Sequence, residues 1–254
     1  MYALKNRAEK FIPRKYLRVV GLYITRTMSI FMRGKKLLCP CCGYQGNRFL
    51  SYGLRPRPNA LCPWCLSLER HRLLWLYLDE KSTIYTKPTK ILHFAPEHQL
   101  QIHMKSKQNI DYTSADLDMP TAMIKMDITN ITFSGNTFDF ILCNHVLEHI
   151  PDDHKAMSEI YRVLKPGGWA ILQTPMNYNS AITDEDITIS DPHEMEKRFG
   201  QNDHVRIYGL DKKNRLESAG FRVVIDTYVK DMPIEKCKHH ALDNTEDIYC
   251  CYKD

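Results

Sequence analysis

Short apolar runs and amphipathic stretches alternate along the chain from about residue 90 onward. The apolar runs have the length and the β-branched and aromatic content of buried strands, and the stretches between them repeat their apolar residues at helical spacing. Seven strands are predicted in this way, over residues 91–94, 110–116, 123–126, 138–142, 169–174, 220–225 and 247–252. Such alternation is typical of an α/β fold with a mostly parallel sheet.

One stretch, residues 137–150, changes from strand to helix character within a few positions. Its apolar run is followed at once by polar side chains, and in an open parallel sheet ligands bind beyond the carboxyl ends of the strands. Pro151-Asp152-Asp153 then starts a helix, and Lys165-Pro166-Gly167-Gly168 ends it. The polar residues at the end of this predicted strand are Asn144, His145, Glu148 and His149.

Three motifs in this part of the chain resemble a known family. They are similar to the second half of class I S-adenosylmethionine (SAM)-dependent methyltransferases, in the branch called type 11, and the resemblance extends from about Lys90 to the C-terminus. It implies a Rossmann-like, seven-stranded, mostly parallel sheet with an antiparallel last strand, SAM as the cofactor, and methyl transfer as the activity. The motifs are Phe138-Asp139-x-Ile141, Asn144-His145-Val146-Leu147-Glu148-His149 and Arg162-Val163-Leu164-Lys165-Pro166-Gly167-Gly168.

The first strand and loop of this domain depart from the family's pattern. Relatives place an acid and a Gly-x-Gly here, whereas this chain has His93, Ala95 and Glu97 at those three positions. SAM has no pyrophosphate, so a nest of glycines is not obligatory. Glu97 could accept a hydrogen bond from the methionine ammonium group, or act only as an acid at a helix N-terminus. The cofactor contacts predicted in this loop are Phe94, Ala95, Pro96 and Glu97.

Acidic residues follow the next two predicted strands. Asp116, with Leu117 beside it, lies about twenty residues beyond the loop, the spacing at which a carboxylate meets ribose hydroxyls. Asp118 is the alternative for this role. By the resemblance, Asp127 and Ile128 flank the adenine and Asp127 accepts a hydrogen bond from the exocyclic amine, although Asp127 could equally be a turn aspartate.

Histidines near the end of the fourth strand could supply a general base. This end is expected to line the methyl-transfer cleft, with Asn144 holding the methionine part of SAM. His145 and His204 are the predicted catalytic residues because histidine titrates near neutrality and a hydroxyl acceptor needs a proton acceptor. His149 is assigned instead to a helix surface. Residues 175–199 form a long polar insertion, of the kind that builds substrate sites or lids.

Four cysteines form two Cys-x-x-Cys pairs upstream of this domain. Cys39 and Cys42 are separated from Cys62 and Cys65 by nineteen residues, the spacing of a structural zinc site. The two knuckles complete a tetrahedron of thiolates with no open position, so we predict a structural Zn²⁺ in a small zinc-ribbon-like module. Cys41 suits the x2 spacing less well. A redox dithiol pair, or thiols packed in a core, are the alternatives.

The first 36 residues are strongly basic. They contain ten Lys or Arg and one acid, and because the whole chain has a formal net charge of +5, the remainder is slightly acidic. Apolar residues recur at helical spacing between Leu17 and Met32, which predicts one or two basic amphipathic helices. Such helices could pack on the protein itself, lie on an anionic membrane surface or bind nucleic acid. The apolar run is too short and too charged for a signal peptide or a membrane span.

The cysteines and the segments together suggest a compartment and a domain organisation. Nine cysteines in this uneven arrangement do not form a secreted disulfide framework and indicate a reducing cytosol. We therefore expect a cytoplasmic protein, with peripheral contact at the inner face of the membrane as an option for its N-terminus. The predicted segments are 1–36, a basic amphipathic helical segment; 37–66, the zinc-binding module; 67–89, a linking helix; and 90–254, the methyltransferase domain.

The acceptor of the methyl group is predicted to be a small molecule or a glycan-type substrate. The catalytic body is mildly acidic, and its insertion could enclose a pocket. RNA is the alternative acceptor, because some ribosomal RNA methyltransferases also join a cysteine zinc module to this kind of domain and the basic N-terminus would neutralise phosphates. A non-catalytic binding or scaffold protein is the third hypothesis. Arg206 could bind an anionic acceptor or pair with an acid of the insertion.

Overall fold

The computed structural model describes residues 14–53 and 56–254, with side chains from Gly21 onward. Residues 1–13 of the predicted basic segment therefore lie outside the described part of the chain. The chain divides into two compact units. The sheet unit comprises Thr83–Asp226 and Asp247–Asp254, and the N-terminal unit comprises the chain up to Ser82 together with Thr227–Glu246.

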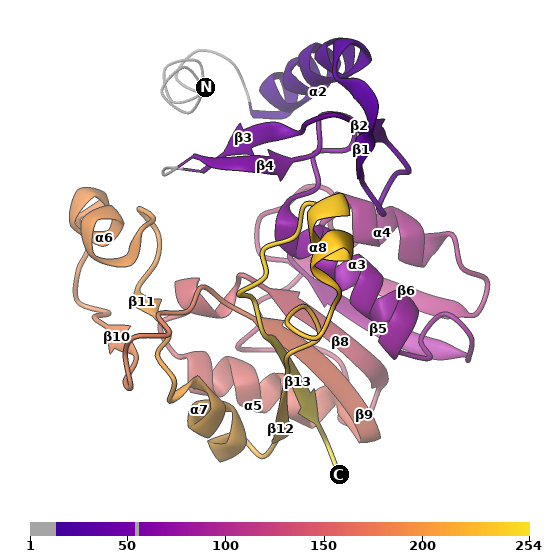
Figure 1. Cartoon of the computed structure of the whole chain (residues 1–254). Helices are drawn as coiled ribbons and strands as arrows, with labels where there is room; N and C mark the ends of the chain where they lie inside the picture. The colour runs from indigo at the N-terminus through magenta and orange to yellow at the C-terminus, as the bar shows by residue number, and fades with distance from the viewer. Residues whose placement is uncertain (1–13, 54–55) are drawn as a thin grey trace. The chain divides into compact units, whose positions relative to one another are not determined.

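The sheet unit is built around a seven-stranded sheet with the strand order β12-β13-β9-β8-β5-β6-β7 (Figure 1). Strands β5 to β9 are parallel, and β13 inserts antiparallel between β9 and β12. This confirms the predicted fold class, including the antiparallel last strand. The strands are β5 (Thr89–Phe94), β6 (Ile110–Asp116), β7 (Ile124–Lys125), β8 (Phe138–Asn144), β9 (Leu164–Gln173), β12 (Arg222–Asp226) and β13 (Ile248–Tyr252).

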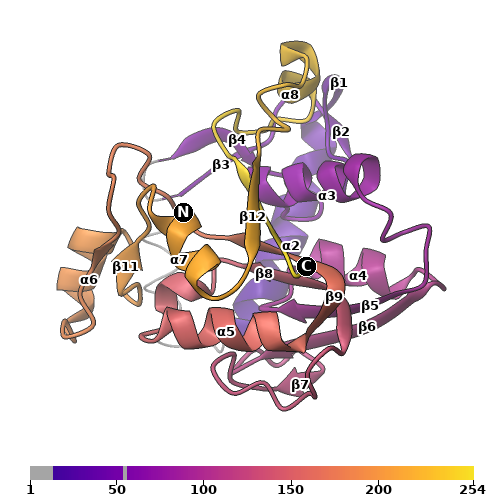
Figure 2. The same ribbon diagram turned by 90° about the horizontal axis from the view of Figure 1, so that it is seen from below.

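Helices cover both faces of this sheet, which explains why the central strands are almost continuously apolar. Helix α4 (His98–Lys105) lies on one face, and α5 (Asp153–Val163) and α7 (Lys212–Ser218) lie on the other (Figure 2). Asp152 caps α5 by accepting a hydrogen bond from the backbone N–H of Lys155. The apolar stripe of α5 is fully buried against the sheet and consists of Ala156, Met157, Ile160 and Val163.

Strand β9 begins earlier than its sequence predicts. The Lys-Pro-Gly-Gly turn was expected to precede a strand starting at Trp169, whereas β9 starts at Leu164 and the register to β8 shifts within the turn. Gly167 has a φ of +77°. A Cβ on Gly168 would lie 2.9 Å from the carbonyl oxygen of Lys165. Gly167 therefore suits the left-handed backbone of the turn, and Gly168 allows β9 to run close beside β8, where the carbonyl oxygen of Asp139 would lie 3.1 Å from its Cβ.

The predicted polar insertion is partly structured. It contains the short strand β10 (Asp184–Glu185), which pairs antiparallel with β11 (Arg206–Ile207), and helix α6 (Pro192–Phe199). Asp191 caps the start of α6, and Gly200, with a φ of +84°, ends it. A single 3₁₀ turn, η1 (Leu147–His149), follows β8.

The N-terminal unit contains two small antiparallel sheets and three helices among its described residues. Its C-terminal contribution, 227–246, was not foreseen from the sequence. The hydroxyl of Tyr228 and the ammonium of Lys236 both bind the carboxylate of Glu80, which fastens this segment to the unit. The domain boundaries at 36, 66 and 89 remain predictions. The elements are α2 (Arg14–Phe31), β1 (Arg33–Leu38) paired with β2 (Gln45–Gly46), β3 (Leu50–Tyr52) paired with β4 (Arg57–Leu61), α3 (Glu69–Lys81) and α8 (Ile234–His239).

Helix α2 exposes much of its apolar surface in the N-terminal unit. Thr25 and Ser29 are buried, whereas Tyr23, Ile24 and Phe31 are 70%, 55% and 88% exposed. The described helices include none that is both long and apolar enough to cross a membrane.

Candidate functional site

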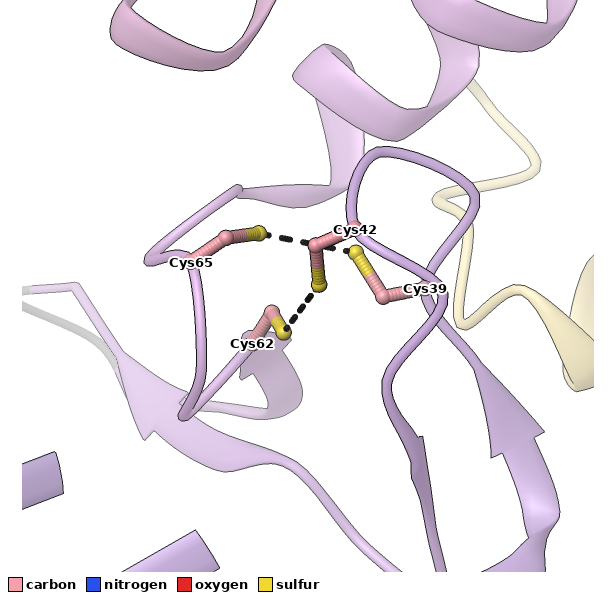
Figure 3. A group of neighbouring side chains, drawn as sticks. All are labelled: Cys39, Cys42, Cys62 and Cys65. Atoms are coloured by element: carbon pink, nitrogen blue, oxygen red, sulfur yellow. Dashed lines mark hydrogen bonds between the residues drawn. The ribbon is translucent and has the colours of Figure 1, made fainter. Parts of the chain in front are cut away.

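The two Cys-x-x-Cys knuckles bring four sulfur atoms together in the N-terminal unit (Figure 3). The Sγ atoms of Cys39 and Cys65 are 3.6 Å apart, and those of Cys42 and Cys62 are 3.8 Å apart. A tetrahedral zinc site with Zn–S bonds of about 2.3 Å separates its sulfur atoms by about 3.8 Å. The cluster therefore fits the predicted ligand set. Cys41 lies outside it, with its Sγ 3.8 Å from the carbonyl oxygen of His71.

Hydrogen bonding within the cluster differentiates the thiols. The pKa of Cys39 is lowered by hydrogen bonds from Cys41, which lies beside the cluster, and then from the other three cluster thiols. The pKa of Cys62 is raised by its hydrogen bonds with Cys39, Cys42 and Cys65. One thiolate surrounded by thiol donors is the arrangement expected of such a cluster before a metal replaces the shared protons.

Two residues whose role the sequence did not reveal hold the second knuckle in place. The linking helix predicted from residue 67 begins at Glu69, with Leu68 at its N-cap. The hydroxyl of Ser67 instead lies 3.2 Å from the Sγ of Cys39. Arg72 is 0% exposed, and burial lowers its pKa. Its guanidinium donates to backbone carbonyls before the second knuckle, after it, and within segment 227–246. These carbonyls belong to Asn59 and Ala60, to Ser67, and to His240 and Ala241, respectively.

The predicted cofactor loop and Asp116 lie on neighbouring strands of the sheet unit. Phe94 at the end of β5 pairs with Ala115 on β6, and the backbone N–H of Ala95 donates to the carbonyl of Ala115 over 3.0 Å. Ala95 has a φ of +46°, a left-handed conformation that glycine adopts without strain. At the position where relatives carry their first glycine, this chain therefore has an alanine in a glycine-like backbone conformation.

A buried hydrogen-bonded network replaces the family's missing acid. His93 is 0% exposed, and its Nε2 lies 2.6 Å from Oε2 of Glu97. The other oxygen of Glu97 accepts a hydrogen bond of 2.9 Å from the side-chain amide of Asn144. On its far side, Nδ1 of His93 is 2.9 Å from the hydroxyl of Tyr112, whose pKa is raised by burial. The carboxylate absent at position 93 is therefore supplied four residues later.

The amide of Asn144 leaves one acceptor unused in this network. Its nitrogen is committed to Glu97, so its Oδ1 is oriented away from that carboxylate. This buried oxygen has no hydrogen-bond partner among the described residues. A buried acceptor beside a carboxylate at the carboxyl end of the sheet suits an ammonium donor.

The remaining predicted cofactor residues occupy contrasting environments. Oδ1 of Asp116 accepts hydrogen bonds from the backbone N–H groups of Asp118 and Met119, whereas its Oδ2 accepts none from a backbone N–H within residues 14–53 and 56–254. Asp127 is exposed, and its Oδ1 accepts hydrogen bonds from the backbone N–H and the hydroxyl of Thr129. Four others differ in whether a side chain can reach a ligand. Phe94 and Ile128 are buried in the core, Pro96 is buried, and Leu117 is 54% exposed.

Both predicted catalytic histidines lie against one buried carboxylate. Glu148 is 0% exposed, with Nδ1 of His145 3.4 Å and Nε2 of His204 4.0 Å from its Oε1. His149 lies on η1 and is half-buried, and its ring packs edge-on against that of His204, with centroids 4.6 Å apart. His145 has a φ of +55°. Glu148 was noted in the sequence only as a polar residue after the strand.

Burial and neighbouring charges set the pKa values in this cluster. Burial alone would raise the pKa of Glu148, but the neighbouring His145 and His149 outweigh it and hold that pKa below its usual value. Burial lowers the pKa of His204. Burial is also the main reason that the pKa of the Cys143 thiol is raised, and the carboxylates of Glu148 and Glu97 both add to this effect, which places the cluster and the cofactor loop around the same strand end.

A second buried arginine supports the turn that carries Glu148. Arg206 is 1% exposed and donates to the backbone carbonyls of Leu147, Ile150 and Pro151. It also pairs with Glu185 of the insertion at 3.0 Å. Of the two roles considered for Arg206, the structure shows the ion pair with the insertion.

Residues 98–172 match the family described as a methyltransferase domain. Together with the strand order, this match identifies the sheet unit as a class I SAM-dependent methyltransferase domain of the type 11 branch. The matched range includes the end of β8 and the Glu148 turn but not the cysteine knuckles.

Short stretches are similar to curated methyltransferases. The chain is 38% identical over 52 residues to "Phosphoethanolamine N-methyltransferase 2" of Caenorhabditis elegans, covering 19% of this chain and 12% of that protein. It is 37% identical over 49 residues to "Demethylmenaquinone methyltransferase" of Staphylococcus epidermidis, covering 19% and 20%. Each of these matches spans no more than a fifth of the relative's length.

Among solved structures, the fold is similar to that of a SAM-dependent methyltransferase from Archaeoglobus fulgidus, with a TM-score of 0.49 and 13% identity over 72% of this chain and 93% of the other. It is also similar to phosphoethanolamine N-methyltransferase 2 of Haemonchus contortus in complex with SAM, with a TM-score of 0.48 and 15% identity over 72% and 52% of the two chains.

Proposed function

We propose that this protein transfers the methyl group of SAM to an oxygen of a small-molecule or glycan-type acceptor. The observation that carries the proposal is the buried, unpaired Oδ1 of Asn144 next to the carboxylate of Glu97. SAM presents an ammonium group that can donate to both, and such a pairing relieves the cost of burying an unsatisfied acceptor. The adjacent β5 and β6 ends supply the remaining contacts.

The chain's residues would hold the cofactor as follows. Asp116 Oδ2 would accept a hydrogen bond from a ribose hydroxyl while Oδ1 keeps its loop folded, and Ala95 would bring the backbone close to the cofactor. Asp127 and the backbone of Ile128 would flank the adenine. When bound, SAM supplies an electrophilic methyl carbon on a sulfonium. Residues that fix donor and acceptor in line can contribute roughly 7–11 kcal/mol of the barrier reduction.

Proton removal from the acceptor is assigned to the histidines at the Glu148 cluster. With SAM bound, the acceptor oxygen would form a bond to the methyl carbon, the C–S electron pair would pass to sulfur to leave S-adenosylhomocysteine, and a histidine would take the hydroxyl proton. His145 is the more accessible of the two, with 26% of its side chain exposed against 2% for His204. Glu148 would stabilise the imidazolium that forms.

The nature of the acceptor is supported by composition and by the relatives. Everything beyond the basic N-terminus is slightly acidic, which disfavours a polyanionic substrate such as RNA. The two curated relatives named above are, by their names, enzymes that act on phosphoethanolamine and demethylmenaquinone. A small or glycan-type acceptor is therefore preferred to RNA, and an active enzyme to a scaffold protein.

Calorimetry with SAM and S-adenosylhomocysteine on the full chain tests the enzyme proposal. We expect saturable binding of both, as an enzyme that turns over requires. Absence of binding would favour the scaffold alternative. Retention on immobilised RNA that falls steeply with salt, and a methylated RNA product, would favour the RNA alternative.

For the cysteine cluster we propose a structural Zn²⁺, because four thiolates complete its coordination and leave no position for a substrate. For helix α2 we propose contact with an anionic membrane surface in the cytoplasm. Its exposed Tyr23, Ile24 and Phe31 adjoin a segment rich in Lys and Arg. Co-sedimentation with anionic vesicles should weaken in Phe31→Ser and remain unchanged in Ile102→Ser, which alters a 55% exposed apolar residue of the sheet unit.

A further inference from the structure

The Glu148 cluster contains more unsatisfied polar atoms than a structural ion pair would leave. Both carboxylate oxygens of Glu148, Nε2 of His145 and Nε2 of His204 are buried without a hydrogen-bond partner among the described residues. Glu148 and His204 are 0% and 2% exposed. Each such group costs free energy when it is buried unpaired. A ligand that satisfies several of them at once is the simplest explanation for their being gathered here.

We propose that Glu148, His149 and His204 bind a divalent metal ion. One donor atom from each of the three lies within 4.8 Å of the others, and Nε2 of His204 is 4.0 Å from Oε1 of Glu148. Ligands bonded to one ion at about 2.0–2.2 Å in a tetrahedral arrangement lie about 3.4 Å apart. The three donor atoms would therefore complete the site by moving closer together by up to roughly 1.4 Å.

The tautomers of both histidines are set for metal binding. Nδ1 of His204 lies 3.3 Å from the carbonyl oxygen of Phe199, and Nδ1 of His149 lies 3.1 Å from that of Asp203. A carbonyl oxygen can only accept, so both Nδ1 atoms carry the proton and both Nε2 atoms carry a lone pair. Metal-binding histidines usually donate their second ring nitrogen in this way.

Nε2 of His204 and Oε1 of Glu148 are 4.0 Å apart, which is too far for a hydrogen bond. A shared proton therefore does not satisfy the two atoms at this distance, whereas an ion bonded to both would. Two imidazoles and one carboxylate suit zinc, manganese, iron or cobalt in the divalent state. His149 keeps 31% of its side chain exposed, so the ion would be open to solvent or to an acceptor on that side.

The consequence for the acceptor rests on the proposed function. An ion at this strand end lowers the pKa of a hydroxyl that binds it. His204 would then be a ligand, and His145, with its Nδ1 3.4 Å from Glu148, would remain to take the proton. The acceptor class that fits is a hydroxyl-bearing compound able to ligate the ion through the oxygen that is methylated.

Mn²⁺ is the probe for the test, because hard Mn²⁺ prefers nitrogen and oxygen donors and does not compete for the cysteine cluster. The full chain is titrated with Mn²⁺, without SAM, and free Mn²⁺ is followed by electron paramagnetic resonance. We expect one Mn²⁺ per chain. Glu148→Gln and His149→Gln should each weaken binding at least tenfold, and the second variant changes a partly exposed side chain with little risk to folding.

Two substitutions of the same kind serve as controls. Glu194→Gln and His154→Gln alter exposed residues outside the cluster, and both should bind Mn²⁺ as the unchanged protein does. No Mn²⁺ binding by the unchanged protein, or equal binding by Glu148→Gln and His149→Gln, would overturn the proposal.

A second measurement separates a ligand from a merely structural carboxylate. Mn²⁺ should raise the melting temperature of the unchanged protein and not that of Glu148→Gln. S-adenosylhomocysteine binding, measured in parallel, should be the same in both. Metal binding without cofactor binding would refute the proposed function and leave the metal site standing. The reverse result would refute the metal site alone.

Discussion

The cysteine cluster and the Glu148 cluster are both groups of side chains that could hold a metal ion, and each is supported by a buried arginine, but they differ in how they are assembled. The cysteines come from two compact knuckles separated by a fixed spacing, and Arg72 holds the second knuckle through its backbone carbonyls. The Glu148 cluster joins a turn after β8 to a residue in the insertion, and Arg206 holds that turn. The cysteine cluster is closed, because its four thiols leave no free coordination position, and its spacing is visible in the sequence. The Glu148 cluster is open on the partly exposed side of His149 and is assembled only by the fold.

The largest effect is expected from breaking the closed cluster. Cys42→Ser removes one thiolate, and the zinc binding free energy of such sites, about 10 kcal/mol or more, is comparable with the whole stability of a domain. The N-terminal unit should lose its fold and its zinc, measured by circular dichroism and elemental analysis. Cys41→Ser, at the adjacent position outside the cluster, should retain both. Equal loss in the two variants would mean that the ligand set is wrong.

The next largest loss of stability is expected from replacing Arg206, which supports the Glu148 cluster. Arg206→Met removes the donors to three backbone carbonyls and one of the two arginines that pair with Glu185, the other being Arg215. A loss of about 3–5 kcal/mol is expected for breaking such a buried network. Urea unfolding measures it. Arg222→Met, which breaks the pair between two exposed side chains, Arg222 and Asp254, should change stability by less than about 1 kcal/mol. Comparable losses would show that Arg206 does not hold the turn.

A smaller effect is expected at the ribose position. Asp116→Asn keeps an oxygen for the backbone N–H groups of its loop but removes the negative charge. S-adenosylhomocysteine should bind about 10- to 100-fold more weakly, the range for hydrogen bonds to charged groups, by calorimetry. Asp118→Asn, two residues away with 84% of its side chain exposed, should bind normally. If Asp118→Asn weakens binding and Asp116→Asn does not, the cofactor residue is the alternative one.

The smallest effect concerns the glycine-like backbone of the cofactor loop. Ala95 has a φ of +46°, so Ala95→Gly should relieve strain and raise stability by up to about 1 kcal/mol. Ala219 has a φ of −82°, and Ala219→Gly should be neutral or destabilising. Urea unfolding of both variants gives the comparison, and a destabilised Ala95→Gly would show that position 95 is not strained.

Local features of the sequence were sufficient for most of the fold and for one of the two clusters. The strands follow from short apolar runs, and β6 spans the predicted residues 110–116. The cysteine pairs were recognisable because ligand spacing within a knuckle depends only on neighbouring residues. The start of β9 was misplaced because two glycines allow a strand to continue through what is otherwise a helix-ending turn.

The sequence by itself therefore determined the α/β fold, the pairing of four cysteines in two knuckles and the acid that ends β6, since each depends on periodicity or spacing within a short stretch. Only the tertiary structure joined residues 227–246 to the N-terminal unit, supplied the missing acid of the cofactor loop from Glu97, and set Glu148 between His145 and His204. The physical reason is that burial and pairing of a charge depend on which distant segments fold beside it, and spacing along the chain does not record this.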